Sequence, residues 1–110
     1  MNTELDITIT DNSDEVLREI ARKKMVALET IGLVAEGYAK RLCPVDTGRL
    51  RGSITHTQMD EDTEVIGTNV EYAPYVELGT TRSRAQPYLR PAISDHVDRY
   101  AHIIKKVMKG

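Results

Sequence analysis

A long helical repeat that stops at a proline limits the folds open to this chain more than any other pattern in it. From residue 13 to residue 43, apolar side chains recur at steps of three and four, the spacing of one face of an α-helix. The stripe consists of Leu17, Ile20, Ala21, Leu28, Ile31, Ala35, Tyr38 and Leu42. Pro44 cannot continue the helix, because it has no backbone N–H to bond the preceding turn. We therefore predict one amphipathic helix over residues 13–43.

Polar residues around this repeat support the same helix. Asn12 and Glu15 are spaced to form a capping box at its start. Glu36 and Lys40 are four residues apart, which favours an ion pair on the outer side. Lys24 interrupts the apolar stripe, so we expect the helix to be solvated at that point.

Three further segments have the character of β-strands. Residues 5–9 alternate apolar and polar side chains, which predicts a strand with one buried face. Residues 53–59 are rich in threonine, and residues 64–68 are suited to be the returning arm of a hairpin. The acidic residues 60–64 then form its solvated tip. A metal loop there is less well supported, because no glycine or regular ligand spacing accompanies the carboxylates.

The C-terminal part of the chain predicts two more helices. Residues 72–78 fit one or two helical turns that open near Pro74 and close at Gly79 in a left-handed conformation. Residues 79–87 lack apolar periodicity and predict a mobile loop that carries arginines. A second amphipathic helix begins near Pro87–Pro91. Its apolar positions are Ile93, Val97, Tyr100, Ile104 and Val107.

Together these elements predict an α+β fold in a single domain that spans residues 1–110. A small, mostly antiparallel sheet packs against the long N-terminal helix and the C-terminal helix. The chain has no Trp and no Phe, so Leu, Ile, Val, Met and Ala must fill the core, with five tyrosines as the only aromatic residues. A core with so few large apolar side chains indicates that contacts between subunits supply part of the stability of the fold.

Charge and cysteine content exclude several classes of protein. A net charge of −2 argues against a surface that coats nucleic acid. Cys43 is the only cysteine, so no intrachain disulfide forms and a reducing compartment fits best. Its position at a helix C-terminus should raise the pKa of the thiol, which favours packing over nucleophilic chemistry. The chain shows neither a leader pattern nor an apolar stretch of bilayer length, so we expect a soluble protein without a membrane partner.

Charges are nevertheless segregated along the chain. Residues 1–17 and 60–64 contain acids without bases, whereas residues 47–59 and 78–94 contain arginines without acids. Identical subunits with such faces could meet head to tail. The alternative is that these segments are ordinary solvated loops.

Catalysis is not supported by the ionisable residues. Ser94, Asp95 and His96 are consecutive, and consecutive helical residues point about 100 degrees apart, so they cannot meet at one atom. Asp98 and His102 share a helical face, but an exposed pair is a better interpretation than a metal site. We therefore predict no catalytic residue, no cofactor and no metal.

Glycine, proline, arginine and tyrosine recur together in three segments, which we call the turn segments: residues 44–54, 72–80 and 86–92. Glycine and proline fix backbone turns at defined places, while the amphipathic side chains present contact area. This combination favours a surface that binds another protein over a pocket for a small substrate.

In this order and spacing, the turn segments and the long helix resemble the tail-completion or head-tail joining family of long-tailed bacteriophages, the gene-product-ten type of minor tail component. The resemblance covers residues 15–107. It implies a structural protein of the virion neck or tail, made in the host bacterial cytoplasm, that acts without catalysis. It further implies a homo-oligomeric ring, for which a hexamer is one option, between the tail tube and the head-connector proteins, with packaged DNA passing through the lumen.

Roles for individual residues follow from that resemblance and from side-chain chemistry. Subunit or partner contacts are assigned to Asp46, Thr47, Arg49, Arg51, Tyr72, Tyr75, Glu77 and Tyr88. Positions facing the lumen, DNA or the next subunit are assigned to Arg82, Arg84 and Arg90. Structural turns are assigned to Pro44, Gly48, Gly52, Gly79, Pro87 and Pro91. Tyr72 and Tyr75 could equally pack internally, and Glu77 could pair within its own chain.

Two other functions stay open at this point. One is a small, non-specific nucleic-acid-binding module that uses the arginine segments, and the other is an enzyme with an unrecognised site.

Overall fold

The structure, a computed structural model, describes residues 11–45 and 48–110. The elements are α1 (Ser13–Leu42), α2 (Arg49–Ser53), β1 (Thr55–Asp60), β2 (Thr63–Gly67), α3 (Ala73–Leu78), α4 (Leu89–Ser94) and α5 (Val97–Lys109). They confirm the α+β class. The strand predicted for residues 5–9 lies outside the described residues.

α1 has the length that its apolar repeat predicts. It ends at Leu42, and Pro44 follows two residues later. Its start differs from the prediction, because the Asn12 side chain makes no capping hydrogen bond. Instead the Asp11 carboxylate accepts the backbone N–H of Ser13 at 2.9 Å. The predicted capping box is therefore wrong.

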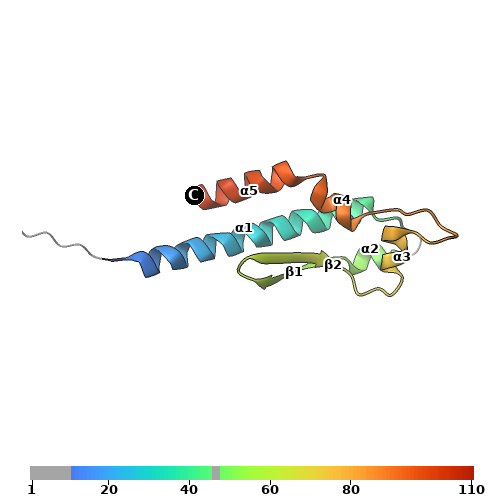
Figure 1. The fold of residues 1–110 in the computed structure, drawn as a ribbon, viewed down its shortest axis with the longest axis horizontal. Coiled ribbons are helices and arrows are strands. Elements are labelled where there is room, and N and C mark those ends of the chain that lie inside the picture. The colour runs from blue at the N-terminus through green and yellow to red at the C-terminus, as the bar shows by residue number, and fades with distance from the viewer. Residues whose placement is uncertain (1–10, 46–47) are drawn as a thin grey trace, which may run out of the picture.

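β1 and β2 form the predicted antiparallel hairpin, which lies along α1 (Figure 1). The register pairs Thr55 with Gly67 and shifts just before Asp60. At the hairpin tip, the Asp62 carboxylate accepts a hydrogen bond from Nζ of Lys24. The lysine that interrupts the apolar stripe thus ties the acidic tip to the helix.

α1 is the middle layer of the molecule (Figure 1). The hairpin lies on one side of it, and α5 runs back along the other side. The sequence predicted both helices against the sheet, but a two-stranded hairpin is covered by α1 alone, and α5 packs on α1 instead. The first turns of α1 project beyond both neighbours, and residues 11–20 are all exposed.

The core consists mainly of small side chains. It lies around the C-terminal end of α1 and contains Ala39, Cys43, Leu50, Ile54, Val70, Ala73, Tyr88 and Ala92. Alanine and tyrosine thus occupy much of the space that we expected larger aliphatic residues to fill. Several of the larger aliphatic residues lie on the surface of the protein instead of in the core: Leu17 is 62% exposed, Leu33 59% and Leu78 66%. Because full burial of such a side chain contributes about 1.5 to 3 kcal/mol, a single copy leaves much apolar surface in water.

The predicted C-terminal helix is broken into α4 and α5. The break falls at Asp95 and His96. The His96 ring stacks on Tyr38 of α1, with the ring centroids 3.5 Å apart and the planes 5° from parallel. Across the break, the Tyr100 hydroxyl donates to the carbonyl of Ala92, a carbonyl of α4. Tertiary contacts with α1 and between the two pieces therefore favour two short helices over one straight helix.

The break also changes which predicted apolar positions are covered. Tyr100 is buried and Val107 is half-buried. Ile93, Val97 and Ile104 are 50%, 58% and 42% exposed. Part of the predicted stripe thus stays on the surface.

Candidate assembly surface

The three turn segments come together at one end of the molecule. α2 belongs to the first segment, α3 to the second, and α4 begins within the third, and all lie at the end away from the start of α1 (Figure 1). A groove of about 580 Å³ runs between these segments. Its walls include Gly48 and Arg49, Tyr72 and Tyr75, and Arg84 and Gln86. The fold therefore joins residues far apart in the sequence into one continuous surface.

Arg49 is held in place on this surface. Its guanidinium donates to both carboxylate oxygens of Glu71, at 3.1 and 3.0 Å, and lies over the ring of Tyr72 at 5.5 Å. The hydrogen bonds lower the pKa of Glu71. Gly48 precedes Arg49 with φ of 80°, a conformation that favours glycine at the start of α2. The first segment thus presents a positioned cation beside an aromatic ring.

Arg51 joins α2 to the end of α1. Its guanidinium donates to the carbonyl of Cys43 at 3.1 Å, so it satisfies a backbone acceptor that the helix end leaves open. Cys43 itself is buried, and burial raises the pKa of its thiol. The sequence predicted a raised pKa from the helix dipole, and the structure adds desolvation as the cause.

Tyr75 and Leu78 form the most exposed apolar part of the surface. They are 62% and 66% exposed, and three residues apart on α3 they share a face. Tyr72 is half-buried and packs against the core. Of the two tyrosines assigned to contacts in this segment, Tyr75 is therefore the one available to a partner.

Glu77 acts within its own chain. Its carboxylate accepts the backbone N–H groups of Tyr88, Leu89 and Arg90, at 3.0, 2.8 and 3.2 Å. These groups lie at the start of α4, where helical N–H groups have no partner in the helix and a negative charge is favoured. Glu77 thus fastens the third turn segment to the second, the intrachain alternative to pairing with a neighbouring subunit.

Tyr88 lies in the core instead of on the surface to which we assigned it. Its side chain is 0% exposed, and its hydroxyl donates to the carbonyl of Ala73 at 3.4 Å. Burial raises its pKa to about 12. Because Tyr88 precedes α4 and faces α3, it anchors the third segment from within.

A tight turn follows α3. Gly79 has φ of 80°, and a Cβ there would lie 2.7 Å from the backbone nitrogen of Ala85. The backbone N–H of Thr80 donates to the carbonyl of Ser83 at 2.9 Å, which closes the turn. The prediction that this position requires glycine is confirmed by both the backbone angle and the lack of space.

Arg82, Arg84 and Arg90 are all exposed. Within the part of the chain that the structure describes, their guanidinium groups form no ion pair. Arg82 and Arg84 lie on the loop after Gly79, and Arg90 is in the first turn of α4. Three unneutralised cations therefore lie at the same end as the exposed Tyr75.

The remaining residues that the sequence assigned to turns or contacts are only partly found in those roles. Asp46 and Thr47 lie outside the described residues. Pro87 lies just before α4 and Pro91 within its first turn, where no backbone N–H is needed. Gly52 lies inside α2, and open space surrounds its Cβ position, so it marks no turn and no close backbone approach.

Of the ionisable residues considered for catalysis, His96 makes a structural contact. The His96 ring stacks on the Tyr38 ring of α1. None of the helices in the described ranges has the length and apolar character to span a bilayer.

A family model described as "Bacteriophage HK97-gp10, putative tail-component" matches residues 8–79, more than half of the chain. The chain belongs to the HK97 gp10 family. Its matched span covers α1, α2, the hairpin and α3, and so includes the first two turn segments. No curated protein and no solved structure matches the chain.

Membership in the HK97 gp10 family confirms the resemblance that the turn segments predicted. It identifies the chain as a phage tail component, which implies a structural role and a place in the virion. Sequence reasoning did not single out Leu78 as part of the surface. Its spacing of three from Tyr75 on a short predicted helix was the signal that could have revealed it.

Proposed function

We propose that the protein is a ring-forming subunit of the phage neck, which joins the tail tube to the head connector without catalysis. The observation that carries the proposal is the exposed apolar surface on the turn-segment end, centred on Tyr75 and Leu78. Aromatic residues are enriched at the centres of protein interfaces, because they bury large area at low entropic cost. A phage tail component with such a surface is suited to bind other proteins of the virion.

The two ends of the molecule differ in a way that suits head-to-tail contact. The projecting start of α1 carries exposed Leu17 beside the acidic residues Asp14 and Glu15. The opposite end carries Tyr75 and Leu78 beside exposed arginines (Figure 1). Both ends are therefore apolar, and their charges are opposite. A repeated head-to-tail contact closes into a ring when the rotation between copies permits.

The exposed arginines at the turn-segment end could contact either DNA or the next subunit in such a ring. Arg82, Arg84 and Arg90 carry charges that no acid of the described chain neutralises. Facing a lumen, they would attract the phosphates of passing DNA without reading its sequence. Facing the next subunit, they would pair with its acidic α1 start.

Mass photometry and negative-stain micrographs of the purified protein test the proposal. We expect rings for the wild type and monomers for a Tyr75→Ser, Leu78→Ser variant. Met59→Ser is the matched control, because Met59 is also 66% exposed but lies on β1. It should assemble like the wild type.

Two outcomes contradict the proposal. One is a wild type that stays monomeric at high concentration. The other is salt-sensitive DNA binding by monomers in the absence of rings, which would favour a non-specific nucleic-acid-binding module.

A further inference from the structure

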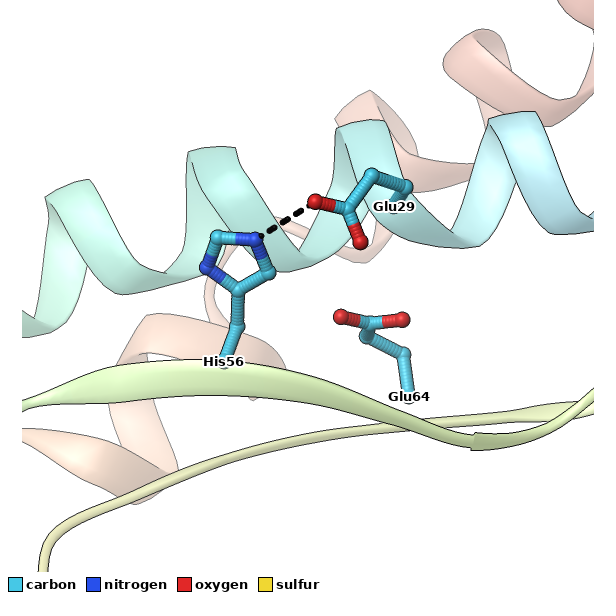
Figure 2. Close-up of side chains that lie close together, drawn as sticks. All are labelled: Glu29, His56 and Glu64. Carbon is cyan, nitrogen blue, oxygen red and sulfur yellow. Dashed lines mark hydrogen bonds and ion pairs between the residues drawn. The ribbon is translucent and has the colours of Figure 1, made fainter.

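Glu29, His56 and Glu64 converge between α1 and the hairpin. Figure 2 shows Glu29 reaching down from α1 while His56 of β1 and Glu64 of β2 point up from the hairpin. One ligand atom from each lies within 4.8 Å of the others. Nε2 of His56 and Oε1 of Glu29 lie 3.0 Å apart. Three different elements thus direct one imidazole and two carboxylates at a common point.

A fourth residue orients the imidazole. Nδ1 of His56 lies 3.1 Å from Oε1 of Glu36, and Lys40 lies 3.4 Å from the other oxygen of that carboxylate. The side chains of His56 and Glu36 are only 15% and 17% exposed. Histidines that bind metals commonly donate their second N–H to a carboxylate, which fixes the tautomer. In the neutral ring with the hydrogen on Nδ1, Nε2 presents a lone pair toward Glu29. Without a metal ion, a second proton on the ring joins the two groups, and the hydrogen bonds to Glu29 and Glu36 raise the pKa of His56 accordingly. A metal ion would replace that proton on Nε2.

Glu64 provides an independent indication of a cation. Both of its carboxylate oxygens are buried and have no hydrogen-bond partner among the described residues. Its pKa is raised, first by burial and then by the charge of Glu29. An ionised carboxylate in such a place is costly unless a charge or a hydrogen bond compensates it.

Gly32 of α1 makes the room for that carboxylate. It is buried in the middle of the helix, and a Cβ there would lie 2.8 Å from Cδ of Glu64. Glycine inside a helix destabilises it by roughly 0.5 to 1 kcal/mol relative to alanine. Gly32 thus lowers the intrinsic stability of α1 but leaves space for the carboxylate of Glu64.

We propose that Glu29, His56 and Glu64 bind a divalent transition-metal ion of the Zn²⁺ type, with Glu36 as the positioning residue for His56. One imidazole and two carboxylates are a donor set that Zn²⁺ accepts, and three protein ligands leave a position for water. The charges also agree. Three carboxylates surround the imidazole and Lys40 offsets one of them, so two negative charges remain for a dication.

Binding requires the ligand side chains to close around the ion. In tetrahedral coordination at about 2.0 to 2.1 Å, two ligand atoms of a Zn²⁺ ion lie about 3.4 Å apart. The three ligand atoms here all lie within 4.8 Å of one another, so the more widely separated ones must move inward when the ion binds. The Glu29 side chain is 61% exposed and can rotate inward. The ion would link α1 to both strands, and so would hold the hairpin on the helix.

Isothermal titration of the full chain with ZnCl₂ at pH 7.5 tests the site. We expect one ion per chain with a micromolar or tighter Kd, and a rise of several degrees in the melting temperature at saturating Zn²⁺. His56→Gln and Glu64→Gln should each weaken binding at least tenfold. Glu36→Gln should weaken it about tenfold or more, as loss of a group that orients a ligand does. The matched control is Asp62→Asn, which alters the ion pair between Lys24 of α1 and the hairpin tip and should bind like the wild type.

A measurement on the wild type keeps the test independent of the folding of any variant. The chain has three histidines. In a ¹⁵N NMR titration with Zn²⁺, the Nε2 signal of His56 should shift, while the signals of His96 and His102 stay in place. Absence of binding at 100 µM Zn²⁺, equal affinity of the His56→Gln variant, or a shift confined to the other two histidines would overturn the proposal. In that case a proton shared between His56 and its carboxylates is the better explanation of the cluster.

Discussion

Replacing Glu77 with alanine removes the acceptor of three backbone N–H groups at the start of α4. Each hydrogen bond to a charged group contributes about 1.5 to 3 kcal/mol, although the three share one carboxylate and exposed donors regain water. Tyr88 is buried, so its N–H has the least access to solvent. Loss of a helix cap alone costs about 1 kcal/mol. We therefore expect Glu77→Ala to lower the free energy of unfolding by about 2 to 4 kcal/mol.

Urea unfolding at pH 7, followed by far-UV circular dichroism on dilute protein, measures this loss. Glu71→Ala is the matched control, because Glu71, just before the second turn segment, also pairs with the first one through Arg49, but its side chain is 72% exposed. Exposed ion pairs contribute about 0 to 1 kcal/mol, so this variant should stay near the wild type. Glu77→Gln keeps one acceptor oxygen and should be intermediate. If Glu77→Ala and Glu71→Ala lose the same amount, the third segment is held by other contacts and the reasoning fails.

Three further predictions concern other parts of the turn-segment end. Gly79→Val should lower the melting temperature and impair assembly, because the backbone angle at Gly79 alone costs a residue with a side chain about 1 to 3 kcal/mol. The control Gly52→Ala lies in open space within a helix and should be neutral or slightly stabilising. Equal melting temperatures of the two variants would contradict this prediction. Burial raises the pKa of Tyr88 to about 12 from about 10 in the unfolded chain, so its contribution is intact below about pH 10 and should decline by up to about 2.7 kcal/mol as the pH rises to about 12. Urea titrations should show a smaller decline for Tyr88→Phe, and identical pH profiles would argue against burial as the cause. Replacing Arg82 and Arg84 with glutamine should reduce ring formation or particle infectivity, and the hypothesis fails if both are unchanged.

The elements that could be predicted from the sequence are those set by local pattern. α1 was predicted to within one residue, because the apolar repeat and Pro44 act over neighbouring residues. The hairpin and α3 followed from threonine-rich arms and from Gly79 in the same way. These signals need no knowledge of what packs against the element.

Features that depend on distant partners could not be predicted in this way. The break before α5 depends on the stacking of His96 on Tyr38, a contact between residues far apart in the chain. From the sequence alone, Glu77 cannot be distinguished from an exposed acidic residue, because its contact with the backbone at the start of α4 is made only in the folded chain. No spacing rule unites Glu29, His56 and Glu64, because they lie on three elements whose packing brings them together.

A cryo-electron microscopy reconstruction of the assembled protein tests the central claim most directly. The account predicts a closed ring in which Tyr75 and Leu78 are buried against the neighbouring copy or the adjoining tail protein. An assembly that leaves this end of the molecule in solvent, or a preparation that contains only single copies, would contradict it.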